Sequence, residues 1–249
     1  MGHEPTFQIV NSTDHSALKV LTHRSASLGD SVMKVHAFPA EFRMLQTAFP
    51  ILLESVGSDD YRAVGLLGFE TGENLYLDDA GWGANYIPAM LKREPFLIHY
   101  AGPHDGAEER LLALDVAHPR VGTEAGEPLF DEYGNRSEFL KQVVGLLEQL
   151  DEGLKHERNF VNTLLQFDLI EPVSFDIILE NGDRSQLLGF STIDEDALQR
   201  LSGEQLALMS ERGFLAPVFM MVASLPNVQN LIDRKNQRLR QSSGLEVFD

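Results

Sequence analysis

The pattern of apolar and polar residues changes character about halfway along the chain. In the first half, short apolar runs such as residues 51–53 and 64–69 are separated by polar turns of only a few residues. Runs of this length, bounded by Gly, Asp and Ser, are typical of β-strands, and connections this short join antiparallel rather than parallel strands. Residues 10–130 are therefore predicted to be mostly β, as an antiparallel meander with short helices.

Other segments of the first half complete this prediction. The helical pattern over 41–48 ends before Pro50, because the residue that precedes a proline avoids the α region. Residues 101–108 and 117–128 are rich in Gly, Pro, His and acidic residues and are predicted to be loops. Additional strands are expected at residues 18–21, 32–35, 75–77, 96–100 and 110–114, and a second short helix at 88–92.

The second half, residues 137–240, is predicted to be mostly helical. Apolar residues recur every three or four positions from 137 to 169, which indicates one long amphipathic helix or a kinked pair. Asn181-Gly182 between two apolar runs predicts a β-hairpin over 174–191. Further helices are expected at 194–201, at 203–212 and at 216–240 with an interruption near Pro226, followed by a frayed tail over 241–249. The predicted class is α+β, with residues 1–249 as a single domain.

Composition excludes several classes of function. The chain has 20 Lys and Arg against 38 Asp and Glu, a formal charge of −18, which repels nucleic acids and anionic membrane surfaces. The absence of cysteine excludes disulfides, zinc–thiolate sites and iron–sulfur clusters. The sequence shows neither a secretion signal nor a run of about 18 apolar residues. We therefore expect no membrane span and a cytoplasmic location.

Motifs for catalysis and for metal binding are missing. The chain contains no Gly-rich nucleotide loop, no serine-hydrolase elbow and no zinc-protease motif. The residues His99, His104 and His118, together with Asp105 and Asp115, have no fixed helical or strand spacing, so we interpret the histidines as solvated loop side chains rather than metal ligands. The sequence predicts neither a metal nor a cofactor.

Residues 68–96 are the stretch richest in side chains suited to recognition, and they include the only tryptophan. In a structural interpretation, Trp82 covers a core and Arg93 pairs with Glu94 or Glu41. In a functional interpretation, Trp82 and Tyr86 form the apolar wall of a concave site in which Arg93 and Asn74 bind a carboxylate or an amide. The candidate binding residues are Glu41, Asn74, Trp82, Tyr86 and Arg93.

Short segments along nearly the whole chain match the pattern of one bacterial protein family in order and spacing. They are 40–42, 49–51, 67–68, 72–75, Trp82, 86–89, Arg93, 95–96, 129–131, 169–172, 188–190, 193–195, 224–225 and Asn227. Together they resemble the SapC family, in which paired arginines are common where this chain has Lys92-Arg93. The resemblance implies an association with surface-layer proteins. It also implies that neighbouring genes encode TonB-dependent receptors, tryptophan-halogenase-like flavoproteins and cupin-like proteins, and it implies no catalytic residues.

Three functions remain open at this point. The first is a soluble, cofactor-free accessory or binding protein beside an outer-membrane uptake or surface-layer system, which binds a protein partner or a small ligand such as an amino acid or peptide. The second is a protein- or amino-acid-modifying enzyme, linked to the halogenase-like and cupin-like neighbours, whose site is assembled from distant residues. The third is a subunit of an oligomer, which predicts an apolar patch on the helices at 139–167 or 216–232.

Overall fold

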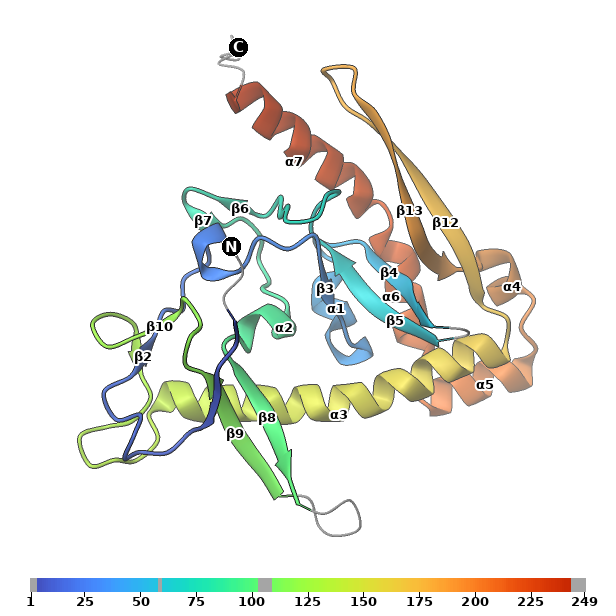
Figure 1. The fold of residues 1–249 in the computed structure, drawn as a ribbon. Helices are drawn as coiled ribbons and strands as arrows, with labels where there is room; N and C mark the ends of the chain where they lie inside the picture. Colours follow the sequence, from blue (N-terminus) through green and yellow to red (C-terminus); the bar gives the residue numbers. More distant parts are fainter. Residues whose placement is uncertain (1–3, 58–59, 103–108, 243–249) are drawn as a thin grey trace.

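A five-stranded antiparallel sheet and one long helix, α3 (Glu138–Gln166), form the framework of the fold (Figure 1). The structure is a computed structural model that describes residues 4–57, 60–102 and 109–242. Its class is α+β, as predicted. The strand order is β12-β13-β4-β5-β3, with β3 at Lys34–His36, β4 at Ile51–Gly57, β5 at Asp60–Leu66, β12 at Ile170–Ile178 and β13 at Arg184–Ile193.

The predicted hairpin is confirmed, and its strands are longer than expected. Gly182 has φ +91°, the left-handed conformation that glycine adopts at no steric cost. The hairpin also belongs to the main sheet, because β13 pairs with β4 at Phe190↔Glu54 and Ser191↔Leu53. The C-terminal hairpin thus completes a sheet whose other strands lie in the N-terminal half, a long-range pairing that local patterns do not reveal.

The remaining strands form three small sheets. One has the order β1-β9-β8, and a pair joins β6 to β7. In the third, β2 pairs with both β10 and β11, which lie inside the segment 117–128 that the sequence predicted as loop, so that prediction was wrong for these four residues. The predicted loop residues 103–108 lie outside the described residues. The bounds are β1 Phe7–Ile9, β2 Lys19–Val20, β6 Leu77–Asp78, β7 Gly81–Trp82, β8 Phe96–Ala101, β9 Glu109–Asp115, β10 Val121–Gly122 and β11 Glu127–Pro128.

Side-chain caps mark the starts of two helices, α3 and α4. The Ser137 side chain accepts from Leu140 N at 3.1 Å at the start of α3, and Asp194 accepts from Ala197 N at 2.7 Å at the start of α4. The predicted interruption near Pro226 separates α6 from α7. The other helices are η1 Ala26–Leu28, η2 Pro39–Glu41, α1 Phe42–Leu45, α2 Ala89–Lys92, α4 Glu195–Gln199, α5 Gly203–Glu211, α6 Leu215–Ser224 and α7 Asn227–Ser242.

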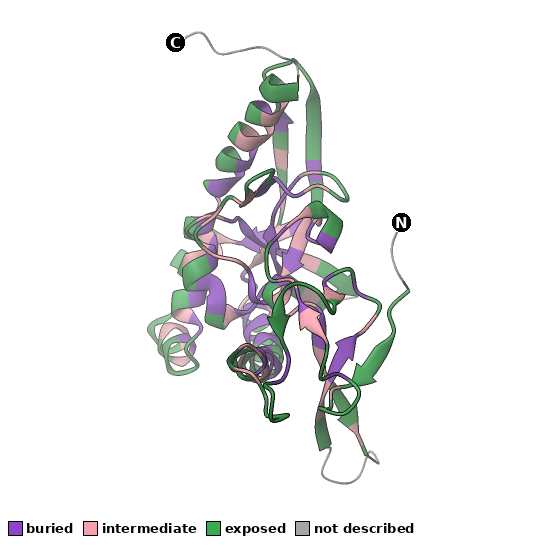
Figure 2. Cartoon of the chain, turned by 90° about the vertical axis from the view of Figure 1, so that its left-hand side faces the viewer, coloured by how far each residue is buried: buried purple, intermediate pink, exposed green. Residues whose placement is uncertain are grey.

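Helix α3 connects two hydrophobic clusters of the described residues. Its C-terminal half contributes Phe160 and Leu164 to the larger cluster, which includes β4 and β5. Its N-terminal half contributes Leu140 and Leu147 to a smaller cluster with β8 and β9. Figure 2 shows buried residues concentrated in the middle of the molecule, whereas the outer ends of β12 and β13 are mostly exposed.

Glu157 attaches α3 to the main sheet. The end of β3 leaves the N–H of Ala63 on β5 without a ladder partner, and this N–H donates to Glu157 Oε1 at 3.0 Å. The other carboxylate oxygen lies 2.7 Å from His36 Nε2. Burial of a carboxylate is costly unless it is paired and hydrogen-bonded, and Glu157 meets both conditions.

A buried cluster of charged side chains positions α2. Asp30 pairs with Arg120 and, at 3.1 Å, with Arg24. The same Arg24 Nη1 donates to the carbonyl oxygen of Leu91 at 2.7 Å. This bond holds the C-terminal end of α2 against the segment that precedes β3.

The described residues include one helical stretch, Leu215–Ser242, that is long and apolar enough to cross a membrane by length and composition alone. In its most apolar 18-residue window, 39% of the residues are buried inside the protein. Core helices of soluble proteins meet the same criterion, so this stretch is weak evidence for a membrane span.

Two glycines on α3 provide a test of this packing. An added Cβ at Gly153 would lie 3.1 Å from the Phe38 ring. An added Cβ at Gly145 would have no described atom within 4 Å apart from its chain neighbours and the backbone of its own helix. We expect Gly153→Leu to lower the free energy of unfolding by about 1–3 kcal/mol through overpacking. We expect Gly145→Ala to raise it by about 1 kcal/mol through helix propensity. Urea denaturation measures both changes, and equal effects of the two substitutions would contradict this packing.

Candidate functional site

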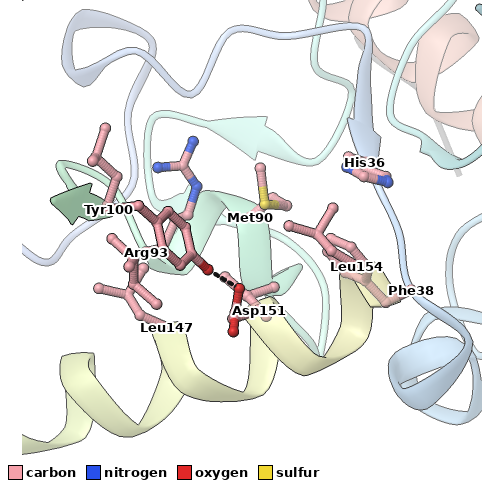
Figure 3. Close-up of a pocket in the computed structure, with 11 residues that line it drawn as sticks. His36, Phe38, Met90, Arg93, Tyr100, Leu147, Asp151 and Leu154 are labelled. Carbon is pink, nitrogen blue, oxygen red and sulfur yellow. Dashed lines mark hydrogen bonds between the residues drawn. The ribbon is translucent and has the colours of Figure 1, made fainter. Parts of the chain in front are cut away.

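A cavity of about 260 Å³ lies between α2, β8 and α3, and we call it the α3 pocket (Figure 3). Most of its wall is apolar, and four polar side chains stand among the apolar ones. The apolar residues are Phe38, Met90, Leu97, Ile98, Leu147, Leu150 and Leu154, and the polar residues are His36, Arg93, Tyr100 and Asp151.

Helical periodicity explains how one side of the pocket forms. Leu147, Leu150, Asp151 and Leu154 are spaced three and four residues apart, so they share one face of α3. Helix α2 supplies Met90, and Arg93 three residues later, from the side opposite α3 (Figure 3).

One end of the pocket is closed by a hydrogen bond from the Tyr100 hydroxyl to Asp151 Oδ1 (Figure 3). Arg110 and Lys155 lie 3.2 and 3.4 Å from the other carboxylate oxygen. The Tyr100 hydroxyl bond, with help from Lys155 and Arg110, holds the pKa of Asp151 below its usual range. The same hydrogen bond raises the pKa of Tyr100. At neutral pH, Asp151 is therefore charged and compensated by neighbours, while Tyr100 is neutral.

Arg93, at the end of α2, has a donor that remains unused. Its Nη1 donates to the carbonyl oxygen of Phe96 at 2.8 Å, and its Nη2 lies 3.1 Å from Glu94 Oε1, the pairing that the structural interpretation predicted. Its Nε is buried and has no hydrogen-bond partner. In the described part of the chain, five buried side-chain polar atoms lack a hydrogen bond, and two of them, Arg93 Nε and Asp151 Oδ2, belong to residues that line the α3 pocket.

His36 lies at the opposite end of the pocket from Tyr100. The centroid of its ring lies 4.4 Å from the centroid of the Phe38 ring, and its Nε2 faces Glu157. Because a charged carboxylate accepts and does not donate, we assign the imidazole proton to Nε2. Nδ1, which makes no hydrogen bond within the described residues, is then an acceptor.

Three of the residues predicted from the sequence form a connected group outside the pocket. Glu41 Oε2 accepts from the Tyr86 hydroxyl at 2.9 Å and from Ala89 N at 3.1 Å. Trp82 Nε1 donates to the Tyr86 carbonyl oxygen at 2.8 Å and stacks on Tyr76, with 6.1 Å between the ring centroids. This group fixes the N-terminal end of α2, and Arg93 at the other end of α2 is the predicted residue that lines the pocket.

Asn74 is held by the interior of the protein. Its side chain is buried, donates to the Asp30 carbonyl oxygen at 2.8 Å and accepts from Tyr76 N at 3.0 Å. Its own carbonyl oxygen accepts from Arg238 at 2.6 Å. Its observed contacts are therefore those of a structural residue.

Sequence reasoning did not identify the other polar residues of the pocket, because His36, Tyr100 and Asp151 are far apart in the chain. One signal was present. Asp151 and Glu157 occupy positions on the apolar face of the amphipathic pattern, where an acidic residue requires a buried partner.

The interpretation of the three histidines as solvated loop side chains is partly wrong. His99 is exposed, as expected, but His118 is buried and its Nδ1 accepts from Arg120 N at 3.2 Å, so it is not a solvated loop residue. His104 and Asp105 lie outside the described residues. Among the residues that are described, no three His, Asp or Glu side chains are grouped closely enough to hold a metal ion.

Two larger hollows occur elsewhere. One of about 460 Å³ lies between Tyr76 and α7, and one of about 780 Å³ lies between α3 and α6. Neither is lined by any of the buried polar atoms that lack a hydrogen bond in the described chain. The α3 pocket is thus the candidate site with both apolar walls and unused polar groups.

The SapC family model matches residues 10–231, most of the chain, and this match confirms the resemblance seen in the sequence. No curated protein and no solved structure matches the chain.

The Glu41 contacts predict a specific dependence of stability on pH. Burial raises the pKa of Glu41 above its usual value. The native state therefore holds this proton to higher pH than the unfolded chain, and the stability that it contributes is lost as pH rises through the raised pKa. Gln at this position turns an amide N–H₂ toward groups that donate to Glu41, so we expect Glu41→Gln to cost about 1–3 kcal/mol.

We expect the difference in Tm between wild type and Glu41→Gln to narrow as pH rises, because only the wild type loses this contribution. Thermal unfolding of both proteins from about pH 5 to pH 8 measures this difference in Tm. A difference that stays constant across this range would contradict the raised pKa.

Proposed function

Because the chain belongs to the SapC family, we propose that it is a cofactor-free binding protein that works beside an outer-membrane uptake or surface-layer system and holds a small apolar ligand in the α3 pocket. The observation that carries the proposal is the pocket itself, with its apolar wall and the unused donor of Arg93.

The composition of the wall supports a ligand that is mainly apolar. Leu147 and Leu154 from α3 lie across the cavity from Met90 of α2 (Figure 3), and Leu150 also lines it. Removal of apolar surface from water contributes about 25 cal/mol per Å², so such a wall favours apolar occupants. A volume of about 260 Å³ is near the lower end of ligand pockets and suits a small molecule or one side chain of a peptide.

The unused polar groups support a ligand rather than a purely structural hollow. A buried donor without a partner costs about 1–3 kcal/mol. Arg93 Nε is such a donor among the described residues. A ligand that supplies an acceptor recovers it, so the pocket favours an occupant with one polar end.

The neutral fluorescent probe N-phenyl-1-naphthylamine tests the pocket independently of charge. Leu154 is 50% exposed at the rim of the pocket, so Leu154→Trp fills the cavity without burying new surface in the core. We expect wild type to bind one probe per chain with enhanced fluorescence, and Leu154→Trp to bind it at least tenfold more weakly.

Leu188→Trp is the matched control, because Leu188 is 60% exposed on β13 and does not line the pocket. Its affinity for the probe should equal that of wild type. Equal affinities for all three proteins, or no binding by wild type, would reject the α3 pocket as the site.

A second candidate function, an enzyme, is favoured by the pairing of His36 with Glu157. A carboxylate that orients one imidazole nitrogen of a histidine in the wall of a pocket is an arrangement found for general bases. In ester hydrolysis, His36 Nδ1 would take a proton from water, the hydroxyl oxygen would bond to the carbonyl carbon, and the alcohol would leave with the proton that His36 returns.

Hydrolysis of p-nitrophenyl butyrate tests this alternative. If it holds, His36→Gln should lower the rate roughly a hundredfold or more, the usual contribution of a general base. His99→Gln, at an exposed position of β8, should leave the rate unchanged. A wild-type rate no higher than that of His36→Gln, with the fluorescent probe bound normally by both, would exclude the enzyme at this site.

A further inference from the structure

We infer that the ligand of the α3 pocket is an apolar monocarboxylate whose carboxylate is bound by Arg93. This inference rests on the proposed function and names the chemical class of its ligand. Three features carry it: the unpaired Nε donor of Arg93, the charge compensation of Asp151 by its neighbours, and the apolar wall beside them.

The hydrogen bonds of Arg93 leave the buried Nε donor of its guanidinium without a partner. Nη1 is committed to the Phe96 carbonyl oxygen at 2.8 Å. Nε has no partner, and Nη2 has only the ion pair with Glu94 at 3.1 Å. The N–H groups of Nε and Nη2 lie on the same edge of the fork, and their spacing matches the two oxygens of a carboxylate. A carboxylate bound there satisfies the buried donor.

Glu94 contacts only the Nη2 end of this edge. It contacts Nη2 but not Nε, and its side chain is 34% exposed. Its second oxygen lies 3.9 Å from His118 Nε2, outside the pocket. The Glu94 carboxylate thus offsets part of the charge of Arg93 at Nη2, while Nε of this pocket-lining residue stays without a hydrogen-bond partner.

Asp151, the acidic side chain of the pocket, does not favour a cationic ligand. Asp151 already accepts from Tyr100 and lies within 3.4 Å of both Arg110 and Lys155. Its charge is therefore compensated before a ligand binds, and an amine would find no unshared carboxylate. The polar end of the ligand is selected by Arg93 and is anionic.

The polar end of the ligand carries a single negative charge. Arg93 is the cationic side chain that lines the pocket, and Glu94 already offsets part of its charge. A phosphate would bring about two charges into a mostly apolar cavity, at a large cost of desolvation. A carboxylate on an aliphatic body matches both the single guanidinium and the leucines of α3.

Isothermal titration with octanoate and with octan-1-ol separates the carboxylate from the apolar body. We expect wild type to bind octanoate at least tenfold more tightly than octan-1-ol. Arg93→Gln should lose this preference while its affinity for octan-1-ol stays within twofold of wild type, and Arg93→Lys should restore part of the preference. Arg184→Gln, at an exposed position of β13, is the matched control and should behave as wild type. Circular dichroism and Tm establish that each variant is folded.

Equal binding of octanoate and octan-1-ol by wild type would overturn the inference while the proposed function stands. An octanoate preference that survives in folded Arg93→Gln and Arg93→Lys would also overturn it. Binding of neither compound, together with no binding of N-phenyl-1-naphthylamine, would reject the pocket as a ligand site altogether.

The same carboxylate chemistry occurs in free acids and at the C-terminus of a peptide. Acetyl-Ala-Ala-Leu with a free carboxylate, compared with its C-terminal amide, distinguishes the two sources. Tighter binding of the free peptide than of octanoate assigns the pocket to peptide C-termini, and the reverse order assigns it to small free acids. In both cases the amide should bind at least tenfold more weakly than the free peptide, and an amide that binds equally well contradicts the role of Arg93.

Discussion

Glu157 is the contact on which the arrangement of the molecule depends most. Its carboxylate replaces the missing ladder partner of Ala63 at the end of β3 and pairs with His36 on that strand. A buried carboxylate is tolerated only with such partners, so this position fixes the rotation of α3 about its axis. The rotation decides which side chains the helix turns toward β8 and α2, and hence the wall of the α3 pocket.

The opposite wall is fixed just as firmly, at both ends of α2. Glu41 accepts from Ala89 N at the start of the helix, and Arg24 donates to the Leu91 carbonyl oxygen near its end. Four residues of α-helix would not be stable alone. Held between these two side chains, α2 keeps Met90 and Arg93 in the wall of the α3 pocket. These contacts fix the backbone from which Arg93 extends, and its Nη1 bond to the Phe96 carbonyl oxygen positions the guanidinium.

Local signals in the sequence predicted the elements, and distant contacts decided the site. Ser137 and Asn181-Gly182 act on neighbouring residues, so the long helix and the hairpin could be predicted. The pairing of β13 with β4 and the approach of His36, Arg93 and Asp151 depend on the tertiary fold, which no local period encodes. Trp82 drew attention because tryptophan occurs both in cores and at binding sites, and its contacts here are those of a core residue.

Native mass spectrometry of the protein purified gently from its own host tests the central claim most directly, with Leu154→Trp expressed in the same host as the comparison. The account predicts that wild type carries an excess mass that is lost on denaturation and that corresponds to a compound with one carboxylate and an apolar body. Leu154→Trp should be bare. An excess mass shared equally by both proteins, or one that belongs to a metal or flavin, would contradict the account.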